Sequence, residues 1–221
     1  NSLHSFVANQ EALKKLSADI CLVNLSIEGD SLESEKIQIH DNSGGIHVDE
    51  FPRLLSVGQP KEKSKTQLSE FGMGMKTAGF WLGRKIDIET KHYLSNDCYK
   101  ITIDIDKLGK DGEVTIVKVK PSSNLPGYTK ICISKLNRRL NRKKRKIKDS
   151  LSSIYRKYIE HEILEIKFEG EYLKPVQIAL EKDASDNPVK KDFVIKLSNG
   201  KEAKGWIGIM ESGKTVFAGF S

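Results

Sequence analysis

Two glycine-rich segments constrain what this chain can fold into more than any other feature. The first, Asp41-Asn42-Ser43-Gly44-Gly45, follows an alternating run over residues 36–40 that predicts a strand. The second, Phe71-Gly72-Met73-Gly74, precedes a run over residues 75–82 that predicts a buried helix. Glycines before a helix let backbone N–H groups approach a ligand closely, and a helix N-terminus favours negative charge. The two segments therefore predict a phosphate site near a carboxylate that could accept from the amino group of a nucleotide base.

The hydrophobic pattern predicts an α+β fold with helices on one face of a mixed sheet. Alternating apolar residues predict strands over residues 19–27, 36–40, 85–92, 99–106, 113–120 and 128–134. Helical spacing predicts helices over residues 5–16, 48–57 and 75–82. The polar segment over residues 59–69 lies between the two glycine motifs, where a flap over a ligand is expected.

The pattern changes after residue 136, which predicts a domain over residues 1–136 and the start of a second, incomplete α/β domain over residues 137–221. Apolar residues recur at helical spacing between Leu140 and Tyr158, and strand patterns follow over residues 163–168, 193–197 and 206–210. The absence of an initiator Met and the end after a strand-like run indicate a fragment. No apolar run approaches the roughly 20 residues that span a membrane, so we expect no membrane partner.

The cysteines indicate a reducing compartment. Cys21, Cys98 and Cys132 lie in apolar alternating stretches and have no C-x-x-C spacing. This predicts buried free thiols in a cytoplasmic protein rather than disulfides or a metal site.

The net charge of +7 is concentrated in one short segment. The basic segment consists of Arg138, Arg139, Arg142, Lys143, Lys144, Arg145, Lys146 and Lys148. Such a density is typical of a surface that contacts nucleic acid or another polyanion. A solvated helix face or a linker is the alternative interpretation.

Taken in order, the motifs resemble those of the GHKL ATPase superfamily, which includes gyrase B, a heat-shock chaperone, MutL, MORC proteins and sensor histidine kinases. The nucleotide site of that superfamily uses a helix with E-x-x-x-N, a D-x-G-x-G loop, a G-x-x-G-x-G loop and a threonine on a later strand. The resemblance covers residues 4–136 and implies the Bergerat fold, a sandwich of a mostly antiparallel sheet and helices. Phe80-Trp81-Leu82-Gly83 and Gly219-Phe220 look most like prokaryotic MORC-like proteins, and MutL-like proteins are also similar.

The resemblance implies a role for residues of both loops. Asp41 matches the acid that binds the adenine amino group, and Gly45 matches the glycine that leaves room for the base, while Ser43 replaces the first glycine. Thr129 resembles the threonine that bonds to the adenine-binding acid. The phosphate-loop match implies contacts to ATP from Gly72, Met73, Gly74, Met75, Lys76 and Thr77, with Lys76 adding a charged contact.

The helix motif departs from the family. Val7-Ala8-Asn9-Gln10-Glu11-Ala12 makes Asn9 the match for the asparagine that ligates Mg²⁺. Four residues earlier the family carries the glutamate that polarises the attacking water, and this chain has Ser5. A serine cannot act as a general base at neutral pH without a partner, and His4 points about 100° away around a helix. A rival register with Asn24 as the ligand is rejected, because residues 18–24 alternate like a strand.

The sequence therefore predicts a GHKL-type protein that binds ATP and Mg²⁺ and acts as a slow ATP-hydrolysing switch or clamp with DNA or a protein partner. By resemblance, nucleotide would order the flap over residues 46–71 and promote a homodimer. Two alternatives stay open: a sensor histidine kinase catalytic domain, which shares the nucleotide site, and a nucleic-acid-binding module without ATPase activity.

Overall fold

An eight-stranded sheet forms the centre of the computed structural model of this protein, which describes residues 2–55, 74–107, 114–175 and 179–211. The strand order is β5-β4-β3-β6-β2-β1-β7-β8, and only the β1–β7 pair is parallel. The strands are β1 (Cys21–Glu28), β2 (Lys36–Asp41), β3 (Gly83–Lys91), β4 (Cys98–Asp104), β5 (Thr115–Val119), β6 (Tyr128–Leu136), β7 (Leu164–Phe168) and β8 (Glu171–Tyr172).

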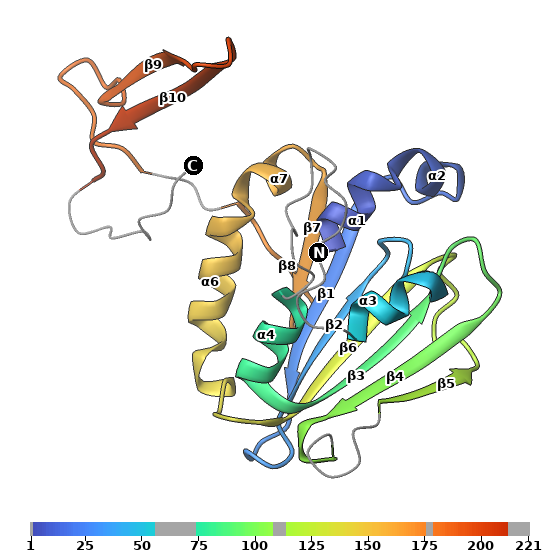
Figure 1. Ribbon diagram of the computed structural model, residues 1–221. Coiled ribbons are helices and arrows are strands. Elements are labelled where there is room, and N and C mark those ends of the chain that lie inside the picture. Colours follow the sequence, from blue (N-terminus) through green and yellow to red (C-terminus); the bar gives the residue numbers. More distant parts are fainter. Residues whose placement is uncertain (1, 56–73, 108–113, 176–178, 212–221) are drawn as a thin grey trace.

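The described helices pack on one face of this sheet (Figure 1). They are α1 (Ser2–Ala8), α2 (Gln10–Lys15), η1 (Val48–Glu50), α3 (Phe51–Leu55), α4 (Gly74–Leu82), η2 (Asn141–Lys143), α6 (Lys144–Ile154) and α7 (Arg156–Glu160). Alternate strand residues such as Ile37 and Ile133 join Phe6 and Leu13 in the core. Apolar residues of a strand point to one face only, so the opposite face of the sheet is polar. The predicted α+β fold with helices on one face is confirmed.

The first helix differs from the prediction of a single helix over residues 5–16, because the chain forms two short helices that meet at Asn9. Asn9 has φ −112° and ψ 14°, and its side-chain Nδ2 donates to the carbonyl oxygen of Ser5 at 2.9 Å. Asparagine side chains compete in this way with the regular backbone hydrogen bonds of a helix. The apolar spacing was read correctly, but the break at Asn9 was missed.

The sheet continues beyond residue 136. Strand β7 pairs with β1, and Leu140, Leu164 and Phe168 share one core with residues of α1 and α2. A separate hairpin of β9 (Lys190–Lys196) and β10 (Glu202–Gly208) lies away from the sheet (Figure 1). The sheet thus crosses the expected boundary, and the division of the chain at residue 136 stays a prediction. No helix of the described ranges is long and apolar enough to cross a membrane.

A buried carboxylate anchors the start of the basic segment to this core. The side chain of Glu35, which is fully buried, accepts hydrogen bonds from the backbone N–H groups of Leu140 at 2.5 Å and Asn141 at 2.8 Å. The guanidinium of Arg139 lies 3.4 Å from the other oxygen of Glu35. These contacts tie the chain before α6 to the loop between β1 and β2, and they assign Arg139 a structural role.

Candidate functional site

The candidate site lies where β2 ends. Asp41 is the last residue of β2, and its neighbours in the sheet are Val23 on β1 and Thr129 on β6. Thr129 in turn pairs with Thr90 on β3. The side chains of these residues point toward the helices, because they alternate along each strand with side chains of the polar face. The structure therefore places Thr129 directly beside Asp41, as the motifs required.

The carboxylate of Asp41 is buried, and its hydrogen-bond partners among the described residues are neutral. Its Oδ2 accepts from the hydroxyl of Ser2 at 2.5 Å, and its Oδ1 accepts from the backbone N–H of Ser43 at 3.0 Å. Burial raises the pKa of Asp41, and the hydrogen bonds from Ser2 and from the backbone N–H groups of Ser43 and Thr129 offset part of this effect. No lysine or arginine of the described ranges forms an ion pair with it. A buried carboxylate without a cationic partner in the described ranges is a candidate for a ligand-binding group.

The turn after Asp41 packs tightly against the end of β3. Gly44 and Gly45 have φ values of +90° and +73°, in the region that favours glycine. A Cβ atom on Gly45 would lie 2.0 Å from the carbonyl oxygen of Lys91, which is shorter than any allowed contact. Ser43, which replaces the expected first glycine, does not adopt a positive φ. Gly45 is therefore required by the backbone packing of the turn itself.

The helix motif lies over the same turn. The hydroxyl of Ser5 donates to the carbonyl oxygen of Ser43 at 2.8 Å. The backbone N–H of Asn9 bonds to the Ser5 carbonyl at 3.2 Å, so both residues belong to one helical turn. Among the described residues, the Oδ1 atom of Asn9 receives only a long contact, 3.5 Å from the hydroxyl of Tyr93. That amide oxygen is thus available to a ligand, whereas the hydroxyl of Ser5 already has a partner.

Of the phosphate-loop motif, the structure describes only the residues from Gly74 onward. Gly72 and Met73 lie outside the described residues, as does most of the expected flap. Gly74, Met75 and Lys76 open α4, and Thr77 in its first turns is exposed. The N–H groups of a first helical turn have no partner within the helix and attract anions.

Close packing fixes the direction of α4. The helix leads directly into β3 and runs back along it, and a Cβ atom on Gly79 would lie 2.5 Å from Cδ1 of Ile86. The N-terminus of α4 consequently points toward the end of the sheet where Asp41 lies (Figure 1).

Sequence reasoning missed Ser2, Thr90 and Tyr93. Thr90 is fully buried, and its hydroxyl accepts from the backbone N–H of Ile46 at 2.8 Å and lies 3.3 Å from the hydroxyl of Thr129. A usable signal was present for Thr90, because it follows Ile86 and Ile88 at an inward position of an alternating strand. For Ser2 there was no comparable signal, since its contact with Asp41 joins residues 39 positions apart.

Some cations of the basic segment contact a carboxylate or an aromatic ring, and others do not. Lys144 pairs with Glu169 and Lys148 pairs with Glu171, each at 2.6 Å. The guanidinium of Arg138 stacks on the ring of Trp81 at 3.7 Å. Within the described ranges, no carboxylate pairs with Arg142, Lys143, Arg145 or Lys146. These four residues, which we call the free cations, remain available to a polyanion.

Comparison with known proteins gives one family match. Residues 10–135 match the family of histidine kinase-, DNA gyrase B- and HSP90-like ATPases, which is more than half of the chain. The matched span contains Asp41, Gly45 and Thr129, whereas Ser5 and Asn9 precede it. No curated protein matches the chain.

Several solved structures are similar at low identity. The ATPase region of Saccharomyces cerevisiae topoisomerase II bound to ICRF-187 is 14% identical with a TM-score of 0.48, over 78% of this chain and 48% of that one. The Aquifex aeolicus MutL ATPase domain complexed with ADP is 14% identical with a TM-score of 0.43, over 78% and 64%. The chain spans about half the length of the topoisomerase structures.

Proposed function

This chain belongs to the family of histidine kinase-, DNA gyrase B- and HSP90-like ATPases, and we propose that it binds ATP between the end of β2 and the N-terminus of α4. The observation that carries the proposal is the buried carboxylate of Asp41, which forms no ion pair with a described residue and lies beside Thr129. A carboxylate oxygen has two lone pairs, so Oδ2 can accept from the adenine amino group as well as from Ser2. The triphosphate would then extend toward the N–H groups at the start of α4.

A magnesium ion fits the residues of this site. Mg²⁺ prefers oxygen ligands and usually keeps several waters while binding phosphate oxygens and one or two protein groups. The Oδ1 atom of Asn9 is such an oxygen, and its 3.5 Å contact with Tyr93 leaves it free to bind. The ion would neutralise charge on the phosphates, and Lys76 would add a second positive charge.

Hydrolysis at this site should be slow. The position of the water-activating glutamate is occupied by Ser5, and its hydroxyl donates to the Ser43 carbonyl. A hydroxyl in that role neither accepts a proton from water nor becomes a base at neutral pH. We infer that the protein works as a nucleotide-dependent switch or clamp, in which bound ATP orders the flap over residues 46–71 and favours a homodimer.

Introducing a base at position 5 should raise ATP hydrolysis. Ser5→Glu places a carboxylate one helical turn before Asn9, and a positioned general base contributes about 100-fold or more to such a step. Because the new side chain is not perfectly placed, we expect steady-state phosphate release to rise at least about 10-fold. Ser5→Ala is the control, since it removes the bond to Ser43 without adding a base. Equal rates for the two variants would contradict the assignment of position 5.

The free cations support DNA as the partner of this switch. Each phosphate contact contributes about 0.9 to the slope of log affinity against log salt concentration for duplex DNA. Changing Arg142, Lys143, Arg145 and Lys146 to Gln should therefore reduce that slope by about 3 to 4, measured by fluorescence anisotropy. The control changes four lysines that pair with carboxylates of the sheet, Lys36, Lys85, Lys100 and Lys118, with the same loss of charge. Equal slopes for the two quadruple variants would contradict a specific DNA surface.

The same assay separates a nucleotide-gated clamp from an independent DNA-binding module. In a clamp, ATP changes the DNA affinity of the wild-type chain, and Asp41→Asn removes that change. In an independent module, ATP and Asp41→Asn leave the DNA affinity unaltered.

We further place the protein in a reducing cytoplasm, a proposal supported by three free cysteines, of which Cys21 and Cys98 are buried.

A further inference from the structure

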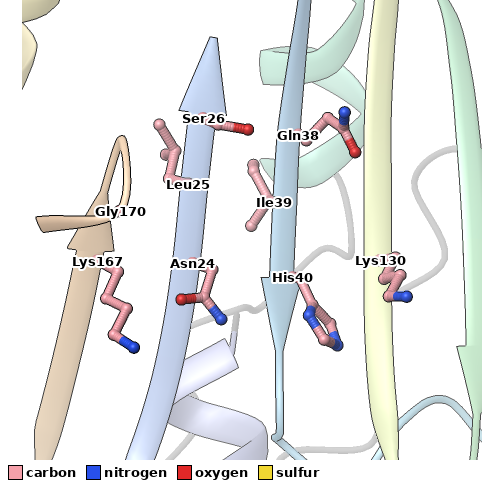
Figure 2. A pocket seen from close by; sticks show the side chains of 9 residues that line it. All are labelled: Asn24, Leu25, Ser26, Gln38, Ile39, His40, Lys130, Lys167 and Gly170. Atoms are coloured by element: carbon pink, nitrogen blue, oxygen red, sulfur yellow. The ribbon is translucent and has the colours of Figure 1, made fainter. Parts of the chain in front are cut away.

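The polar face of the sheet, opposite the candidate nucleotide site, contains a hollow of about 290 Å³. Its polar side chains come from four neighbouring strands, and Figure 2 shows them at two levels of the sheet. Lys167 on β7, Asn24 on β1, His40 on β2 and Lys130 on β6 are direct partners in register. Ser26 and Gln38 form the next level, and Gly170 lies at the turn after β7. No helix of the described ranges covers this face.

Some of the polar groups that line this hollow have no hydrogen-bond partner among the described residues. His40 lines the hollow. Its Nε2 atom is covered by protein atoms and is, among the described residues, the one buried side-chain nitrogen or oxygen atom without a hydrogen bond, so a ligand would reach it only if the ring shifted. A buried polar atom without a partner is costly, and in native structures it usually bonds to water or a ligand. The ring of His40 is held in place by an edge contact with the ring of Tyr128 at 5.7 Å between centroids. The amide of Asn24, which also lines the hollow, forms no hydrogen bond with a described residue.

The charge of the hollow is positive. The ammonium of Lys167 lies over the ring of Tyr172 at 4.4 Å and pairs with no carboxylate in the described part of the chain. Lys130 donates to the Ser122 hydroxyl at 2.5 Å and to its carbonyl at 3.1 Å, which leaves one of its three donors. Glu89, the acid of the same row, accepts hydrogen bonds from Tyr128 and Ser122 and keeps its negative charge, so the two lysines exceed it by one positive charge. Burial and the charge of Lys130 lower the pKa of His40, and the charges of Asp41 and Glu89 oppose this effect.

We propose that this hollow binds a small oxyanion, a carboxylate or a phosphate group, between Lys167 and Lys130, with His40 and Asn24 as hydrogen-bonding partners. Adjacent strands lie about 4.8 Å apart, so the Cα atoms of Lys167 and Lys130 are separated by roughly 14 Å across three strand gaps. Their long side chains can therefore approach one ligand from opposite sides. The volume is at the lower limit for ligand pockets, which suits a small polar molecule. This site is distinct from the nucleotide site, because Asp41 and His40 point to opposite faces of β2.

The test uses the imidazole signals of the full 221-residue chain in NMR titrations with inorganic phosphate and, separately, with acetate at constant ionic strength. His40→Asn assigns the His40 signal. We expect a saturable shift of that signal with at least one of the probes. Lys167→Gln should weaken the apparent affinity about 10-fold or more, while Lys100→Gln, a lysine on the same face that lies near Asp87, should not change it.

Comparison of the two probes identifies the group that is bound, and either one saturating supports the site. Saturation by neither probe would overturn the inference, because the hollow would then hold only water. An undiminished response in Lys167→Gln would do the same, provided that its melting temperature matches that of the wild type. The titration is repeated in Asp41→Asn. A response lost there would show that phosphate acts through the nucleotide site, whereas a retained response supports an independent site even if ATP binding fails.

Discussion

Asp41→Asn should lower the affinity for ATP by on the order of 100-fold, measured by isothermal titration calorimetry with Mg²⁺. A hydrogen bond to a charged acceptor contributes about 1.5–3 kcal/mol. The variant loses that acceptor and directs an amide toward a base that offers its own N–H groups. The Asn side chain has nearly the same shape, and its oxygen can still accept from Ser2 or Ser43. Wild-type affinity in the variant would contradict the assignment of Asp41.

The same variant should not lose stability. The pKa of Asp41 is raised by burial, so the folded protein holds this proton more tightly than the unfolded chain does. As pH rises above the ordinary range of Asp, the unfolded state ionises first and the wild type loses stability. Asp41→Asn removes that loss, and we expect its melting temperature at neutral pH to equal or exceed that of the wild type. A lower melting temperature would mean that the carboxylate is structural.

Gly45→Ala should destabilise the fold by about 2–5 kcal/mol. A positive φ costs an alanine about 1–2 kcal/mol, and overpacking adds about 1–3 kcal/mol. Overpacking applies here because the new Cβ would lie 2.0 Å from the Lys91 carbonyl oxygen, and neither backbone can move freely at the end of β3. The free energy of unfolding from urea titrations measures the effect.

Gly170→Ala provides the matched control. Gly170 has a similar φ of +83°, but an added Cβ there meets no atom within 4 Å. Only the backbone strain remains, so the expected loss is about 1–2 kcal/mol. If the two variants lost the same stability, the packing of the turn on β3 would not be as the structure describes it.

Much of the sheet could be predicted because its residues follow a simple rule. In β2 and β3, isoleucines alternate with charged or polar residues. An alternation with a period of two predicts a strand with one buried face. Asp41 and Thr129 were matched from motif order, and the register of β2 with β6 placed them side by side. Fold class and strand positions were therefore accessible from local patterns alone.

Other features depend on contacts between distant parts of the chain. The parallel pairing of β7 with β1 joins Leu164 to Cys21, and no local pattern specifies such a partner. The helix break at Asn9 occurs where its side chain also bonds to the Ser5 carbonyl, and apolar spacing reveals neither feature. Within the basic segment, the charges look alike in sequence, and only the positions of Glu35, Glu169 and Glu171 show which ones are neutralised.

Calorimetric titration of the unmodified chain with ATP and with inosine triphosphate tests the central claim most directly. The two nucleotides differ at the base position that Asp41 is proposed to bind, where the 6-amino donor of adenine becomes an acceptor. A carboxylate that faces an acceptor in place of a donor weakens the binding free energy by about 2–3 kcal/mol. The account predicts ATP binding that is on the order of 100-fold tighter than that of inosine triphosphate. Equal affinities for the two would contradict a carboxylate–adenine contact at the end of β2.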